Sequence, residues 1–388
     1  MKTGIRTRKI FIAITMACIL LCDCVQSYVS PYKSPATGYL VVDGYITGNG
    51  ATQYYLTRTI PLPGDSTIPV VTGAGLQVEG TDGAIYSLAE LGGGRYGIDS
   101  MPLRTGLSYR LRIKLPGGES YLSDFVPYKP TPPIDSVNWI YDVNGVTIFV
   151  NTHDPANSTR YYQWRYDQTY EYHAAEASSF IYVPATNSIV QRTPAQNVYT
   201  CWMDVPVTNI VVGTSAKLSQ DVIYEYPLLT IPPNSQPLSV EYSILVSQYA
   251  LSDSGYFFLQ QMARNNESLG SIFDALPSQP AGNIHSLTDP NEPVIGYIQA
   301  GTVQQQRIFI SNQQVSNWVF LNRCGDPDII VPNIPDSIKF YFGEVGLNPL
   351  YQNFGPSPPL FGWFANELDC TNCTLQGGTT QKPSFWPN

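Results

Sequence analysis

The chain has 388 residues, which predicts two or three domains at about 100–200 residues each. Only 13% of its residues are charged, against about 25% in a typical soluble domain, and the surplus of Tyr (27), Gly (31) and Pro (32) is typical of an extracellular β-protein. The hydrophobic fraction of 43% excludes a disordered chain, and the net charge of −9 argues against nucleic acid as a partner, because such partners need basic stripes.

The N-terminus predicts a secretion signal. A basic segment that includes Lys2 and Arg6 precedes an apolar run over residues 10–21, which is shorter than the ~20 residues of a membrane span. No comparable apolar run follows in the sequence. We therefore expect residues 1–23 to be a signal peptide and the mature protein to have no transmembrane helix.

Cysteines at the end of this run indicate a lipoprotein. Cys24 has the aliphatic Leu21 three positions before it, but Asp23 directly before it, where lipoprotein signals have a small residue. We expect the lipid on Cys24, with Cys22 as the alternative. Two or three acyl chains hold a protein at a membrane stably, whereas one binds reversibly. The Pro/Ser-rich residues 24–38 predict a tether between the lipid and the fold.

Strand signals begin after the tether. Residues 40–47 and 53–59 predict the first two strands, and turn dipeptides then mark three hairpins, since such dipeptides supply the positive φ angles of two-residue turns. These dipeptides are Asp82-Gly83, Gly117-Gly118 and Asn144-Gly145. In residues 109–115, apolar residues alternate with Arg110, Arg112 and Lys114, which predicts one core face and one solvent face.

Residues 128–133 (YKPTPP) predict a stiff linker and a domain boundary. The segment before it, residues 39–129, has the strand count and hairpin order of a small Ig-like β-sandwich. Its glycine and tyrosine pattern also resembles the transthyretin-like domains of the carboxypeptidase regulatory type. The segment after it, residues 130–388, predicts a larger β-rich sandwich domain with one inserted helix near residues 252–269.

Residues 160–173 carry the strongest strand signal of this second domain, because aromatic residues from Tyr162 to Tyr172 alternate with polar ones. An aromatic stripe can stack on sugars or peptides, but we favour a place in the sandwich core. Further strands are expected over residues 239–248, 294–300 and 306–311, and a loop over residues 275–293.

Four cysteines remain after signal removal, and an even number in an exported chain predicts two disulfides. The candidates are Cys201, Cys324, Cys370 and Cys373, and the sequence leaves three pairings open. The short spacing of Cys370 and Cys373 also fits a redox pair or half of a zinc site. A redox pair would open a helix in a βαβ unit, which the sequence does not predict. A zinc site would need a second close pair of ligands, which is also missing, so disulfides are the favoured interpretation.

Motifs for catalysis, metal binding or cofactors are not found in the sequence. It has no G-x-S-x-G elbow, H-E-x-x-H, P-loop or G-x-G-x-x-G pattern. Glu171, His173 and Glu176 are a weak metal candidate, because Glu176 falls beyond the strand that the other two share. His153 is expected at a strand end and His285 in a loop. We predict no catalytic residues, no metal and no cofactor.

Several segments together resemble Bacteroidetes outer-membrane lipoproteins of domain-of-unknown-function family 4249. They are residues 24–28, 40–44, 161–164, 201–202, 238–249, 270–274, 282–285, 294–297, 370–373 and 382–387. The resemblance covers nearly the whole mature chain, and Asp23 is its departure from the pattern. It implies a lipid-anchored protein of the outer membrane that faces the cell surface and is encoded beside a TonB-dependent, SusC-like transporter.

The resemblance brings no established site residues. It favours a non-enzymatic accessory of such a transporter, which captures a ligand or organises the complex. The alternative is a glycan- or peptide-binding surface module that acts independently of a transporter and uses exposed aromatic side chains.

Overall fold

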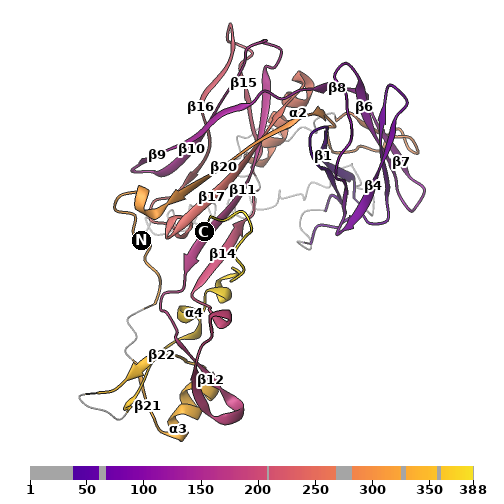
Figure 1. Cartoon of the computed structure of the whole chain (residues 1–388). Coiled ribbons are helices and arrows are strands. Elements are labelled where there is room, and N and C mark those ends of the chain that lie inside the picture. The colour runs from indigo at the N-terminus through magenta and orange to yellow at the C-terminus, as the bar shows by residue number, and fades with distance from the viewer. Residues whose placement is uncertain are drawn as a thin grey trace, which may run out of the picture.

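The structure, a computed structural model, describes residues 38–60, 67–207, 209–267, 282–324, 329–355 and 360–387. Strands form most of its regular structure, which confirms the prediction of a mainly β protein. Figure 1 shows three parts along the molecule, named below the first body, the second body and the distal lobe. Cys22, Cys24, the predicted signal peptide and the tether up to residue 37 lie outside the described residues.

The first body is a sheet of ten strands, eight of which form a closed ring in the order β6-β3-β4-β5-β2-β1-β19-β8. The ring closes because β8 pairs again with β6, while β7 and β18 extend from β6. The strands are β1 (Leu40–Thr47), β2 (Thr52–Arg58), β3 (Gly75–Gly80), β4 (Ile85–Gly92), β5 (Arg95–Ile98), β6 (Ser108–Lys114), β7 (Ser120–Ser123), β8 (Val126–Lys129), β18 (Ile284–Ser286) and β19 (Ala300–Gly301).

The predicted hairpins of this body are present. β3 pairs with β4 and β6 pairs with β7, both antiparallel, and Gly83 and Gly118 take the positive φ angles that their turns require. On β6, the predicted apolar face (Tyr109, Leu111 and Ile113) is fully buried.

Residues 282–301 return to the first body from far along the chain. Ile284, Val294, Ile298 and Ala300 are buried in its core, and β19 joins β1 to β8 through parallel pairs. Two sequence expectations were therefore wrong in detail. The loop predicted over residues 275–293 contains β18, which carries His285, and the strand predicted over residues 294–300 is reduced to a bridge at Ile295 and the two-residue β19.

Gly296 explains the interrupted strand. Its φ of 151° turns the backbone away from regular pairing, and a Cβ at this position would lie 2.4 Å from the carbonyl oxygen of Val42. The segment nevertheless runs beside β1, since the amides of Val42 and Ile46 donate to the carbonyl oxygens of Ile295 and Gln299 at 2.8 and 2.9 Å.

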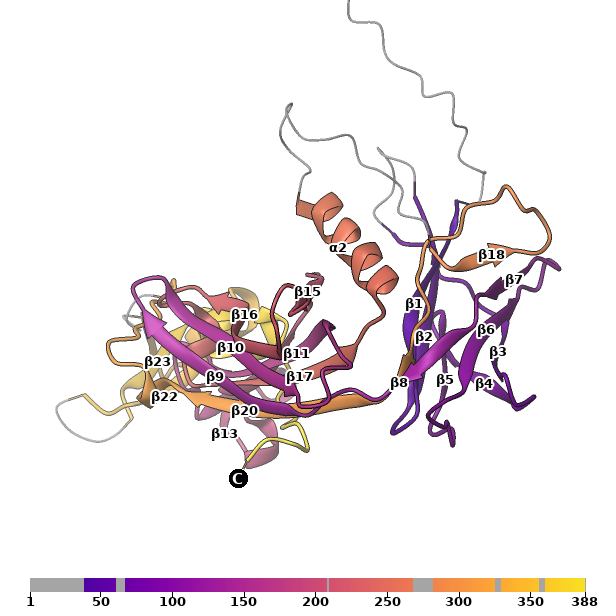
Figure 2. The ribbon, with the colours of Figure 1, turned by 90° about the horizontal axis from the view of Figure 1, so that it is seen from above.

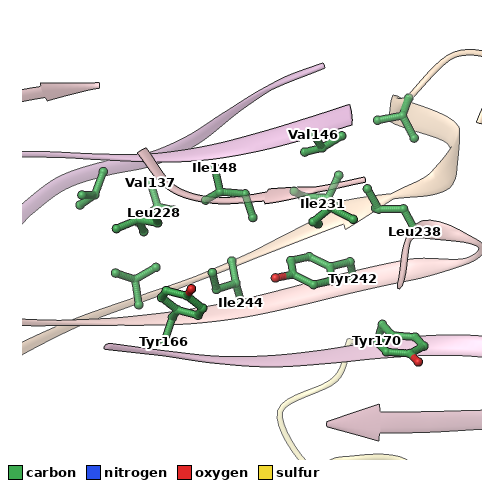
Figure 3. Packing of buried hydrophobic residues seen from close by; sticks show 14 of the residues in the cluster. Val137, Val146, Ile148, Tyr166, Tyr170, Leu228, Ile231, Leu238, Tyr242 and Ile244 are labelled. Carbon is green, nitrogen blue, oxygen red and sulfur yellow. The ribbon is translucent and has the colours of Figure 1, made fainter. Parts of the chain in front are cut away.

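The second body consists of two sheets packed face to face, as Figure 3 shows for its core. One sheet has the order β16-β10-β9, and the other has β14-β11-β17-β20 with β15 also paired to β11. The strands are β9 (Ile134–Asp142), β10 (Gly145–Asp154), β11 (Tyr161–His173), β14 (Thr200–Val205), β15 (Val211–Thr214), β16 (Asp221–Ile231), β17 (Glu241–Ala250) and β20 (Val303–Ser311).

The aromatic stripe of β11 lies in this core. Tyr162, Trp164, Tyr166, Tyr170 and Tyr172 are all buried and belong to one cluster, so the core interpretation is confirmed and the stripe is closed to ligands. The predicted helix is also present as α2 (Asp253–Glu267), and its predicted last two residues lie outside the described part of the chain.

The distal lobe has its own small core. A hairpin of β12 (Phe180–Val183) and β13 (Ser188–Gln191) packs beside a sheet of order β21-β23-β22. The sheet strands are β21 (Ile329–Pro332), β22 (Asn348–Asn353) and β23 (Gly362–Asn366). The prediction of one helix missed the short α3 (Pro335–Ile338), the π-helix Lys339–Glu344 and α4 (Leu368–Thr371).

Two of the chain crossings between the first and second bodies, the one after β8 and the one after β19, are bonded to each other. Thr131 follows β8, and its amide donates to the Oγ1 of Thr302 at 2.7 Å, directly after β19. The Oγ1 of Thr131 also accepts from the amide of Ala250 at the end of β17. In the described ranges, no helix is long and apolar enough to cross a membrane.

Candidate functional site

Two disulfides shape the end of the second body that faces the distal lobe. Cys201 bonds to Cys373, and Cys324 bonds to Cys370, each with a Cα–Cα distance of 5.8 Å. The prediction of two disulfides from these four cysteines is confirmed. Cys370 and Cys373 are therefore not bonded to each other, although only two residues separate them.

A cleft of about 690 Å³ opens beside Cys324, which is within the size range of small-molecule sites. One wall is apolar and is formed by the loop after β20. The other side offers amides and charged groups from elements far apart in the sequence. The lining includes Trp318, Val319, Phe320, Leu321, His173, Gln236, Asn312, Arg323, Asp369 and Gln376.

The apolar wall is held at both ends. The Nε1 of Trp318 donates to the carbonyl oxygen of Ser235 at 3.0 Å, and the amide of Val319 donates to the Oδ1 of Asn234 at 2.9 Å. The Cys324 disulfide fixes the far end to α4. Between these points Phe320 and Leu321 are exposed, Leu321 by 82%, so a ligand can reach both without displacing the core.

Two amides of the opposite wall are held by separate hydrogen bonds. The Nε2 of Gln236 donates to the Oε1 of Gln376 at 2.8 Å, and the Nδ2 of Asn312 donates to the carbonyl oxygen of Leu238 at 2.8 Å. The hydroxyl of Ser239 is buried in this wall and has no hydrogen-bond partner among the described residues. A buried polar atom without a partner costs free energy, which a bound polar group can recover.

His173 reaches the cleft because it ends β11. Its ring stacks on Tyr199 with centroids 4.5 Å apart, and its Nε2 lies 3.7 Å from the Oε1 of Glu171. No group of three possible metal ligands found among the described residues includes His173 or Glu176. The group that is found contains Glu367, Asp369 and Cys370, but the Cys370 sulfur is bonded to Cys324 and is not free to bind a metal.

The other histidines lie elsewhere. On β10, the Nδ1 of His153 is 2.7 Å from the Oδ2 of Asp135, and this hydrogen bond raises the pKa of the exposed His153 above its usual value. On β18, the Nε2 of His285 is 3.1 Å from the Oδ1 of Asp124. Both contacts lie away from the cleft.

Sequence reasoning named His173, Cys324 and Cys370 but did not bring them together. It missed Trp318, Phe320 and the amides of Gln236 and Asn312, because these residues belong to no motif and meet only after folding. The one usable signal was Cys324, since a disulfide to Cys370 places the loop before it beside α4.

Comparison with known proteins identifies a matching family and several solved structures of low sequence identity. A family model described as a domain of unknown function (DUF4249) matches residues 27–307. No curated protein matches the chain. A crystal structure of the FN1–FN3 domains of chicken CNTN1 is 14% identical, with a TM-score of 0.18. The match covers 56% of this chain and 63% of the CNTN1 chain. A crystal structure of a mutant Salmonella alpha-2-macroglobulin is 12% identical, with a TM-score of 0.16. The match covers 59% of this chain and 14% of the alpha-2-macroglobulin chain. This chain thus spans less than two thirds of either structure.

Proposed function

The chain belongs to the DUF4249 family, and from that premise we propose that it is a non-enzymatic lipoprotein of the outer-membrane surface. In this proposal a lipid on Cys24 anchors the chain, and the protein captures a ligand for a TonB-dependent, SusC-like transporter. We also propose that the first body is a variant of the transthyretin-like or Ig-like sandwich, enlarged by residues 282–301.

The observation that carries the ligand-capture role is the cleft beside Cys324. Its lining combines an apolar loop with side-chain amides, and two disulfides hold its walls in place. Such a site binds a ligand without having to order itself first, which lowers the entropic cost of binding.

The same cleft favours binding over covalent catalysis. A serine nucleophile needs a base within hydrogen-bond reach. The hydroxyl of Ser239 has no such partner among the described residues, although His173 lines the same cleft. His173 instead stacks on Tyr199.

Purification from native outer membranes tests the partner and the anchor. The tagged full chain is expected to recover a TonB-dependent transporter in mild detergent, and mass spectrometry of its N-terminal peptide is expected to find acyl chains on Cys24. Cys24→Ser is expected to release the protein from the membrane, whereas the matched variant Cys22→Ser leaves it bound. Repeated recovery of the chain alone contradicts the transporter role. Release of the protein by Cys22→Ser would show that Cys22, and not Cys24, carries the lipid.

A glycan-binding module that acts without a transporter is the second candidate. The exposed ring of Phe320 beside the amides of Gln236 and Asn312 favours it, because sugars are bound by stacking together with hydrogen bonds from planar amides. A glycan array is expected to lose its signal with Phe320→Ala and to keep it with Phe361→Ala, an exposed aromatic of the distal lobe. Equal signals from both variants exclude this use of the cleft.

A further inference from the structure

A second cavity lies between the first and second bodies, under α2. Figure 2 shows α2 between β1 of the first body and β15 of the second. The cavity has a volume of about 410 Å³, and a smaller one of about 50 Å³ adjoins it through shared walls. Clefts between domains are frequent sites for small molecules, and this volume is within their range.

The walls of this cavity differ in polarity. Its apolar side is formed by Phe258, Leu259 and Met262 of α2, with Val42 and Ile295 of the first body. Its polar side is the outer face of β11, where Gln163, Arg165 and Asp167 alternate with the buried aromatic stripe. A ligand that fits both walls has an apolar part and a polar head.

Arg165 is already paired. Its Nη2 and Nη1 donate to the two carboxylate oxygens of Asp43 at 2.7 and 3.2 Å, so that the pair joins β11 to β1. A bidentate pair of this kind satisfies the guanidinium, and Arg165 is therefore a poor partner for an anionic ligand.

Asp167 has no such partner. It is exposed and makes no ion pair with any cation among the described residues. Burial lowers the pKa of Arg307, and the negative charge of Asp167 opposes this shift. Arg307 is on β20, however, and β17 lies between β20 and β11. Its guanidinium lies over the ring of Phe385 at 3.7 Å and donates to the Oγ of Ser243. The cavity thus has two carboxylates and one guanidinium, and its unpaired charge is negative.

From these contacts we propose that the cavity under α2 binds a small organic cation, an amine with an apolar body. The apolar body packs against Phe258, Leu259 and Met262, and the ammonium group pairs with Asp167. This site is separate from the cleft beside Cys324 and needs neither a lipid nor a transporter. The proposal can therefore be tested independently of the function proposed above.

Three probes with one carbon skeleton test the charge preference. The lipid-free chain is titrated calorimetrically with 4-phenylbutylamine, 4-phenylbutanol and 4-phenylbutyrate. We expect the amine to bind about fivefold more tightly than the alcohol, as one partly exposed ion pair allows, and the carboxylate to bind more weakly than both. Equal binding of amine and carboxylate overturns the proposal.

Variants of Asp167 locate the site. Asp167→Asn is expected to bring amine binding down to that of the alcohol, and Asp167→Lys is expected to reverse the order so that the carboxylate binds best. The matched control Asp99→Asn removes an exposed carboxylate of the first body and is expected to change nothing. Amine affinity that is unchanged by Asp167→Asn, or that falls equally with Asp99→Asn, overturns the assignment.

Discussion

At the scale of single residues, the side-chain amide of Gln248 is the centre of a hydrogen-bond network in the core of the second body. This side chain is fully buried on β17. Its Oε1 accepts from the indole Nε1 of Trp164 at 2.8 Å, and its Nε2 donates to the carbonyl oxygen of Pro132 and the Oγ1 of Thr152 at 2.8 and 2.9 Å. One amide thus satisfies polar atoms from both sheets and from the linker between the bodies.

We therefore expect Gln248→Leu to be strongly destabilising. The substitution keeps the approximate volume but leaves the Trp164 indole and the Pro132 carbonyl without a partner, and each buried unsatisfied group costs about 1–3 kcal/mol. Urea unfolding is expected to show a loss of about 3 kcal/mol in the free energy of unfolding.

The matched control is Gln77→Leu on the exposed side of β3, where the amide makes only one long hydrogen bond, to Ser87 at 3.4 Å. It is expected to change stability by less than about 0.5 kcal/mol, as exposed substitutions usually do. Equal effects from the two variants would show that the network around Gln248 contributes nothing.

At the scale of elements, the cationic row of β6 is tied to its neighbour β3. Glu79 lies between Arg110 and Arg112 and pairs with both, at 2.6 Å to Arg110. The side chain of Glu79 is only 13% exposed. The hydrogen bond from Arg112 is the largest influence on the pKa of Glu79, and the net effect is to lower it. Arg110 and Arg112 therefore form cross-strand ion pairs with Glu79 on the solvent face of the sheet.

This pair predicts a pH-dependent contribution to stability. Because the pKa of Glu79 is lowered in the folded state, its contribution is complete above the unfolded-state pKa and disappears as the pH falls through the folded-state pKa. Glu79→Gln is expected to cost about 1 kcal/mol at pH 7 and nothing in acid well below that range.

Urea unfolding of wild type and variant between pH 7 and pH 2 measures the difference. Glu344→Gln, an exposed carboxylate of the distal lobe without an ion pair among the described residues, is the control and is expected to leave the free energy of unfolding unchanged. A cost for Glu79→Gln that stays constant with pH would contradict the ion-pair explanation.

Among the elements, those with a local sequence pattern could be predicted, and those that depend on tertiary packing could not. Alternation on β6 and β11 and the glycines of the turns, such as Gly83, are local signals, and those strands and hairpins were found. β18 was missed, and β19 was predicted as part of a longer strand over residues 294–300, because two or three residues carry no pattern of their own. Their pairing depends on β7 and β1. The cleft beside Cys324 was missed for a related reason, since His173, Gln236 and Trp318 meet only through tertiary packing.

At the scale of the whole molecule, the first body is built from two distant parts of the chain. Residues 38–129 supply most of its strands, but β19 closes the ring and Ile284, Val294 and Ile298 complete the core. The domain boundary expected near residue 129 stays a prediction, and these contacts show that residues 282–301 pack with what lies before it.

A truncated chain tests this assembly. Residues 38–130 alone are expected to aggregate and to unfold without a cooperative transition, because β1 and β8 become unpaired edges and apolar core residues lose their cover. Adding residues 282–302 after a flexible linker is expected to restore a monomer with cooperative unfolding. Circular dichroism melting and size-exclusion chromatography measure both, and a well-folded residue 38–130 fragment would contradict the prediction.

The crossed connectivity of the cysteines also has a consequence for oxidative folding. Cys370 and Cys373 are close in sequence, yet their partners are 46 and 172 residues away. Closing a short loop in an unfolded chain costs less entropy than closing a long one, so we expect the non-native bond between Cys370 and Cys373 to form first. Each native bond then requires thiol–disulfide exchange through a mixed disulfide, and a chain oxidised without an isomerase is expected to accumulate as this misbonded species.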